Sequence, residues 1–170
     1  MPTTFTNQAT LSYNNQSIPS NVVTGVLTEV LSVSKTAIPA AYQNGDTITY
    51  AVQLVNSGTA ALTGLTLTDN LGAYTPAAGT AAVVPMTYQS DTLRYYRNGI
   101  LQATPTVAAT SPLTVTGLSI PAGGNTTLMY AVKTNQFTPY GAEESVTNTA
   151  TVTGGGLAAP LTAEATVNAD

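Results

Sequence analysis

The side chains that most often perform acid, base or nucleophilic chemistry are scarce in this chain of 170 residues, which has no histidine and no cysteine. A histidine-based triad, a thiol nucleophile and a zinc site of the usual ligands therefore cannot be assembled. Among the carboxylates only Glu143 and Glu144 are adjacent. Neighbouring residues of a strand point to opposite faces, which makes these two a poor acid–base pair. We expect a protein that is not an enzyme and that binds no cofactor or metal.

Two aspartates stand beside turn-forming residues. Asp46 follows Asn44-Gly45, and Asp69 precedes Asn70. A calcium site needs several oxygen ligands that converge from one loop, and each of these segments offers a single carboxylate. We interpret both as turn residues.

Aromatic and cationic side chains gather around one predicted hairpin, at Arg94, Tyr95, Tyr96 and Arg97. Tyrosine and arginine dominate binding hot spots, so this segment is a candidate ligand surface. Tyrosine rings that pack on their cross-strand neighbours produce the same pattern. Packing is the favoured interpretation.

The low charge of the chain excludes several partners. Charged residues make up 7% of the sequence, with 4 basic and 8 acidic side chains and a formal net charge of −4. Nucleic acid binding needs clustered lysine and arginine, which are missing, so no nucleic acid partner is expected. Apolar stretches are far shorter than the roughly 20 residues of a membrane-spanning helix. Uncharged hydroxyl-rich sheets also repel one another weakly, which favours close packing of identical subunits.

The residues that begin the chain alternate as a half-buried strand. Residues 5–13 place Phe5, Ala9, Leu11 and Tyr13 on one face, interrupted by Asn7. The chain then runs from residue 22 to 34 without a proline, with Gly25 as a candidate bulge. Thirteen extended residues would reach about 43 Å, more than one small sandwich needs, so this run is expected to pass from one module into the next.

The rest of the chain is rich in short strands separated by turn signals, of which Asn98-Gly99 is the clearest. Residues 72–85 and 104–112 are predicted as long loops. No segment keeps a helical period. We predict an all-β protein, an immunoglobulin-like two-sheet β-sandwich at 30–170 with an N-terminal β extension at 1–29. The strands are expected at 48–55, 62–68, 88–96, 100–103, 113–118, 126–132 and 146–153.

The N-terminal hairpin resembles the last hairpin of the same chain. Residues 5–29 laid over 146–170 without a gap give 6 identities in 25 positions, against about two expected by chance in so threonine- and alanine-rich a composition. The chain therefore carries one β module and a spare hairpin. Such a hairpin either packs on its own module or completes a neighbour.

Six motifs stand at Leu31–Ala37, Asn44–Tyr50, Leu54–Gly58, Leu67–Leu71, Ile120–Gly123 and Val146–Val152. Together they resemble a known family, the conserved surface-antigen repeat (domain of unknown function eleven), over about residues 30–170. The family forms tandem β-sandwich repeats in bacterial and archaeal cell-surface proteins and has no catalytic residues, so the resemblance implies a structural role at a surface. This chain departs from the family in having one repeat and in having Gly72 where proline is usual.

Lys35 is a candidate for a covalent crosslink, because related surface sandwiches sometimes join a lysine to an asparagine through an isopeptide bond. Asn168 or Asn148 is the candidate partner, with Asp69 as the neighbouring carboxyl. The bond needs a buried lysine with a lowered pKa. Lysine is seldom buried without a partner, so a solvated lysine at the end of a strand is the favoured interpretation.

These observations lead to a hypothesis of self-assembly, in which the N-terminal segment adds as a strand to an adjacent subunit. Tail and acceptor are different surfaces, so the contact is head-to-tail and forms a filament whose partner is the chain itself. The acceptor is expected near 146–153 and the central loops. A monomeric surface adhesin is the alternative. The predicted interface consists of Phe5, Asn7, Ala9, Leu11, Tyr13, Val22 and Val26.

The expected location is extracellular, on a cell or spore surface. The first residues have neither a basic start nor an apolar segment, so no signal peptide is expected in this sequence. This suits a subunit that is assembled inside a mother cell and released, or one whose signal has been removed. A surface receptor or anchor is not identified by any motif.

Overall fold

The computed structural model describes residues 3–27, 30–77, 79–141 and 143–170, without the side chains of Thr3, Thr4, Val26 and Leu27. Every regular element within these ranges is a β-strand. The chain divides into two compact units, residues 1–30 and residues 31–170. Each unit is described by itself below.

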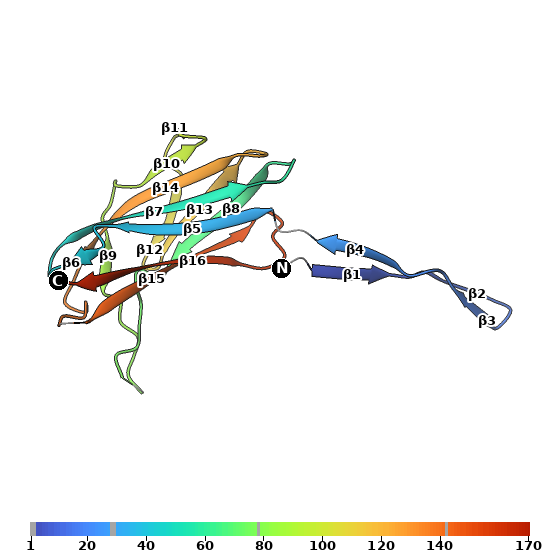
Figure 1. Ribbon diagram of the computed structural model, residues 1–170, viewed down its shortest axis with the longest axis horizontal. Coiled ribbons are helices and arrows are strands. Elements are labelled where there is room, and N and C mark those ends of the chain that lie inside the picture. Colours follow the sequence, from blue (N-terminus) through green and yellow to red (C-terminus); the bar gives the residue numbers. More distant parts are fainter. Residues whose placement is uncertain (1–2, 28–29, 78, 142) are drawn as a thin grey trace. The chain divides into compact units, whose positions relative to one another are not determined.

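The first unit is a two-stranded antiparallel ribbon (Figure 1). Asn14 and Asn15 both have positive φ, as a two-residue hairpin turn of type I′ requires. Phe5 pairs with Gly25 in register, so Gly25 is not a bulge. The ribbon is built from β1 (Thr3–Asn7) with β4 (Val23–Leu27), and β2 (Thr10–Tyr13) with β3 (Gln16–Pro19).

The single strand predicted at residues 5–13 is wrong, because the ladder breaks at Gln8 and Ala9. The Ser20 side chain is the physical reason. Its Oγ accepts a hydrogen bond from the Ala9 N–H at 3.0 Å, and its own N–H donates to the Ala9 carbonyl at 2.8 Å. A side-chain hydrogen bond of this kind replaces one rung of the ladder.

The second unit is a sandwich of two sheets, which confirms the predicted all-β, immunoglobulin-like architecture (Figure 1). One sheet has the order β11 (Ile100–Leu101), β10 (Arg94–Arg97), β14 (Asn125–Thr134), β7 (Thr47–Asn56) and β5 (Leu31–Ile38), with β9 (Met86–Tyr88) also paired to β14. The other has the order β12 (Thr106–Thr110), β13 (Leu113–Ile120), β8 (Leu62–Asp69), β15 (Ser145–Gly154), β16 (Leu161–Ala169) and β6 (Ala41–Tyr42).

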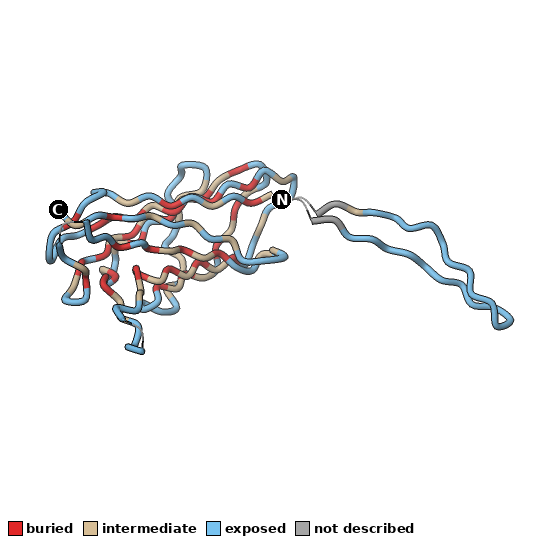
Figure 2. Tube along the Cα trace, turned by 60° about the horizontal axis from the view of Figure 1, so that its bottom comes forward, coloured by how far each residue is buried: buried red, intermediate tan, exposed pale blue. Residues whose placement is uncertain are grey.

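The core lies between these two sheets and is made by strict alternation. In β7 and β14 every second residue is buried, as expected of strands that cover a core on one face. Figure 2 shows buried positions along the strands of the sandwich and almost none along the ribbon. The largest fully buried side chains are Tyr42, Tyr50, Tyr130, Ile48, Leu54, Leu65, Leu67, Leu71, Met86, Leu93, Leu113 and Leu118.

The run predicted at 22–34 passes from one unit to the next as expected, and it consists of the two strands β4 and β5. Two further strand predictions need correction. The strand predicted at 88–96 is divided into β9 and β10, because residue 91 has a positive φ of 64° in the turn between them. The loop predicted at 104–112 contains β12, whose pairing with β13 outweighs its flanking prolines.

Candidate functional site

A buried ion pair occupies the centre of the sandwich. Lys35 lies in the middle of β5 rather than at its end, and its side chain is fully buried, as is that of Asp69. The Lys35 ammonium contacts Asp69 Oδ2. The solvated lysine favoured from the sequence is therefore wrong. The alternation of β5 places Lys35 on the same interior face as Leu31 and Val33.

Asp69, the last residue of β8, accepts hydrogen bonds on both oxygens. Oδ2 accepts from Lys35 and from the Tyr130 hydroxyl, and Oδ1 accepts from the Leu71 N–H at 3.0 Å. The Lys35 Nζ also lies 4.5 Å from the centre of the Tyr50 ring, a cation–π distance. These contacts offset part of the desolvation that a buried charge pair suffers.

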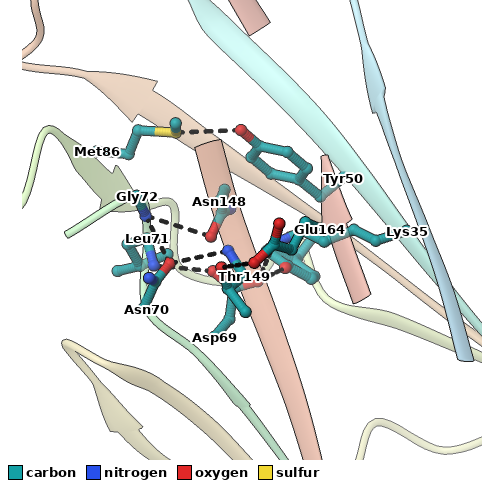
Figure 3. Close-up of polar contacts among 11 residues, drawn as sticks. Lys35, Tyr50, Asp69, Asn70, Leu71, Gly72, Met86, Asn148, Thr149 and Glu164 are labelled. Atoms are coloured by element: carbon teal, nitrogen blue, oxygen red, sulfur yellow. Dashed lines mark hydrogen bonds and ion pairs between the residues drawn. The ribbon is translucent and has the colours of Figure 1, made fainter. Parts of the chain in front are cut away.

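Asn148 of β15 completes this cluster (Figure 3). It is fully buried, and its Oδ1 accepts a hydrogen bond from the Gly72 N–H at 3.2 Å. Ala150, two residues further along the same face of β15, pairs with Asp69, so Asn148 is a diagonal neighbour of that carboxylate. Within the described residues its Nδ2 has no hydrogen-bond partner. Buried amide nitrogens are rarely left in this state.

Burial shifts the pKa values of this cluster. Desolvation lowers the pKa of Lys35 from 10.5 to about 8, although the negative charge of Asp69 opposes the change. Desolvation also raises the pKa of Tyr50, against a smaller opposing effect of the Asn148 amide. The pKa of Tyr130 is raised as well, first by burial and then by the Asp69 charge.

Asn168, the other crosslink partner predicted from the sequence, lies elsewhere. It is exposed in β16, where its backbone pairs with Ser145 and Ala41. The cluster instead includes Tyr50, Tyr130 and the Gly72 N–H, none of which the sequence analysis identified. The alternation of residues 48–55 would have placed Tyr50 inward, but no sequence signal points to a backbone N–H.

The ribbon carries apolar side chains that it cannot bury. The exposed fractions are 59% for Phe5, 66% for Leu11, 73% for Tyr13 and 55% for Val22. Asn7 and Ala9 are also exposed, whereas the side chain of Val26 lies outside the described residues. Because a ribbon is a single layer, it has no interior of its own.

The free edges of the sandwich limit where another strand can add. The acceptor is predicted near 146–153, where β16 pairs along one side of β15 and β8 pairs with residues 150–154 on the other. The outer side of β16 pairs only with β6, at Asn168 and Ala169. Along residues 161–167 this side of β16 therefore has no ladder partner in the described part of the chain, although β5 of the other sheet lies close to it.

The candidate ligand surface at 94–97 is partly internal. Tyr95 is buried, and its hydroxyl donates to the Ser119 carbonyl at 2.9 Å. The Arg97 guanidinium donates to Gln102 Oε1 from Nε at 3.1 Å. Only Arg94 of this segment is exposed, and it donates to the backbone carbonyls of Asp91 and Leu93. The geometry matches the packing interpretation.

Among the described residues no group of three or more acidic side chains is arranged to hold a metal ion. In the same residues no helix has the length and apolarity needed to cross a membrane.

Comparison with known proteins yields no sequence match. No protein-family model matches the chain, and no curated protein matches it. The resemblance to the surface-antigen repeat family therefore stays a prediction.

Solved structures of similar fold do exist. The N-terminal domain of a Streptococcus gordonii adhesin aligns with a TM-score of 0.60 at 14% identity, over 88% of this chain and 35% of that one. The pilus backbone protein RrgB of Streptococcus pneumoniae aligns with a TM-score of 0.56 at 10% identity, over 72% of this chain and 31% of that one. The major pilin SpaD of Corynebacterium diphtheriae aligns with a TM-score of 0.54 at 16% identity, over 79% of this chain and 33% of that one. This chain thus spans about a third of each protein, and the likeness establishes the fold alone.

Gly72 should tolerate no side chain. Its φ is +74°, and a Cβ would lie 2.4 Å from Val146 Cγ1. Gly72→Ala should lower the free energy of unfolding by more than about 2 kcal/mol, through clash and strain together. Gly99 has a similar φ of +77° with no atom near its Cβ position, so Gly99→Ala should cost only about 1 kcal/mol. Denaturant unfolding of both variants checks this, and equal losses would contradict it.

Stability should fall as the pH rises above 10. The raised pKa values of Tyr50 and Tyr130 mean that the folded state keeps phenol protons that the unfolded chain releases. The contribution of these two tyrosines to the free energy of unfolding is fully present below the tyrosine pKa of the unfolded chain, about 10, and is lost as the pH rises above it. Thermal unfolding between pH 9 and 11.5 measures the decline. Tyr50→Phe should make it shallower while changing the melting temperature little at pH 7.

Proposed function

We propose that this chain is the structural subunit of an extracellular, pilus-like surface fibre, in which the N-terminal ribbon of one subunit adds to the sandwich of the next. The observation that carries the proposal is the set of exposed apolar side chains of the ribbon, Phe5, Leu11, Tyr13 and Val22. Burying a large apolar side chain contributes about 1.5–3 kcal/mol. Burial of four such side chains against a second layer would therefore stabilise the ribbon by several kcal/mol.

The outer edge of β16 is the acceptor that we propose. Residues 5–12, which cover the end of β1 and the first three residues of β2, resemble residues 146–153 of β15, with identities at Thr6, Asn7, Ala9 and Thr10. In the sandwich β15 is the antiparallel partner of β16. A strand that resembles this partner is suited to the side of β16 that has no ladder partner, alongside β5, where unpaired N–H and C=O groups form a template.

Such a contact is head-to-tail and generates a filament, because the donor ribbon and the acceptor edge are different surfaces. Residues 3–27 contain no charged side chain, so no like-charge repulsion opposes their approach. With no cysteine in the chain the joint has no disulfide. Pilus proteins among the structures of similar fold support a fibre at the cell surface, and the resemblance to surface-antigen repeats supports the same location.

Removing the ribbon should abolish assembly. A variant that lacks residues 1–27 keeps the whole sandwich, which begins at Leu31, and should remain a soluble monomer. Sedimentation and negative-stain imaging of the full chain and the variant measure the difference. Fibres that persist in the variant would contradict strand donation, and a monomeric full chain would favour the adhesin alternative.

Cysteine pairs should map the acceptor edge, and the cysteine-free sequence makes this test clean. We expect Ser12→Cys, on the polar face of the ribbon, to form intersubunit disulfides with at least one of T162C, E164C and T166C, which replace exposed residues of β16. Disulfides need Cβ atoms about 3.5–4.5 Å apart. A covalent ladder on a non-reducing gel after oxidation is the expected result.

The control places the acceptor cysteine at Ala109, an exposed residue of β12 at the opposite end of the same sheet. Its combination with Ser12→Cys should give no ladder. A ladder through A109C, with none through β16, would move the acceptor to the other edge.

A further inference from the structure

The buried cluster at the centre of the sandwich holds a nucleophile, a proton carrier and an electrophile together. The Lys35 amine contacts Asp69 Oδ2, and the carbonyl of Asn148 accepts from the Gly72 N–H at 3.2 Å. All three side chains are shielded from water. In Figure 3 they project from three different strands, β5, β8 and β15, into one region between the sheets.

Asn148 is the member of this cluster whose hydrogen-bonding groups are not all satisfied within the described residues. Its Oδ1 is held by a backbone donor, whereas its fully buried Nδ2 has no partner among the described residues. A buried polar group without a partner costs free energy. Loss of this nitrogen as a leaving group would remove the unsatisfied donor.

We propose that Lys35 and Asn148 form an intramolecular isopeptide bond, with Asp69 as the proton carrier. The proposal concerns the sandwich alone and is independent of fibre assembly.

Each step of the reaction balances. Lys35 passes a proton to Asp69, and the neutral Nζ attacks Cγ of Asn148. The Gly72 N–H, already bonded to Oδ1, stabilises the negative charge that develops on that oxygen. Asp69 then delivers its proton to Nδ2, and the Cγ–Nδ2 bond breaks. An amine and a primary amide become one secondary amide and ammonia, and the second proton of the former ammonium leaves with ammonia as an ammonium ion.

The surroundings favour each of these transfers. Burial lowers the pKa of Lys35 to about 8, so roughly a tenth of the amines are neutral at pH 7. The Tyr130 hydroxyl, bonded to Asp69 Oδ2, holds the carboxyl group in place. Exclusion of water from the site protects the intermediate from hydrolysis. No external reagent is required.

Intact mass of the purified full chain under denaturing conditions tests the proposal. The expected mass is lower than the sequence mass by one ammonia. Proteolysis followed by fragment mass analysis should find one branched peptide that joins Lys35 to Asn148. A full-length chain that is folded and has the full sequence mass would overturn the proposal.

Two variants separate the crosslink from other ammonia losses. Lys35→Met should restore the full mass, while Lys133→Met, at an exposed lysine of β14, should keep the deficit. Succinimide formation at Asn44-Gly45 or Asn98-Gly99 also releases ammonia, but it does not depend on Lys35. A deficit that persists in Lys35→Met would therefore overturn the assignment, as would a branched peptide through any other residue.

Discussion

A ribbon of two strands has two faces and no interior, and this constraint governs the chain. In the sandwich the two sheets cover each other's inner faces, so β7 and β14 bury every second residue. The ribbon has the same alternating sequence and no second layer, and Phe5, Leu11 and Tyr13 stay exposed. Both units thus follow one rule of strand patterning with opposite outcomes. The proposed assembly rests on this difference, because a second copy of the chain could supply the layer that the ribbon lacks.

The charge pair inside the sandwich has a different character. Buried lysine is costly unless it is paired, and Lys35 has Asp69 and the Tyr50 ring as partners. Because Lys35 belongs to one sheet and Asp69 to the other, their contact fixes the register between the sheets at one point. A glycine supports this arrangement from outside the strands. Only a residue with a free N–H and a positive φ can donate to Asn148 from position 72, and proline offers neither.

Patterning alone predicted the architecture, whereas the details of the site depended on tertiary contacts. Alternation and turn residues identified the sandwich, and the Asn98-Gly99 hairpin lies where its sequence places it, with Arg97 paired to Ile100. Local rules failed where a side chain outside the pattern intervened, as Ser20 does at Ala9. They failed again at Lys35, because the general preference of lysine for solvent says nothing about a carboxylate 34 residues away. Asn148 and Asn168 lie on neighbouring strands and look alike in the sequence, yet one is buried and the other exposed.

The placement of the few basic residues has a consequence for digestion by proteases. Trypsin-like proteases cut after lysine or arginine and need a segment that can leave the fold and enter their active site, which surface loops provide. All four such residues of this chain lie within strands, Lys35 in β5, Arg94 and Arg97 in β10 and Lys133 in β14. No loop of the described residues contains a cleavage point for these enzymes, and the first 34 residues contain none at all. Digestion of the described residues by such proteases therefore requires that a strand first detaches from its sheet.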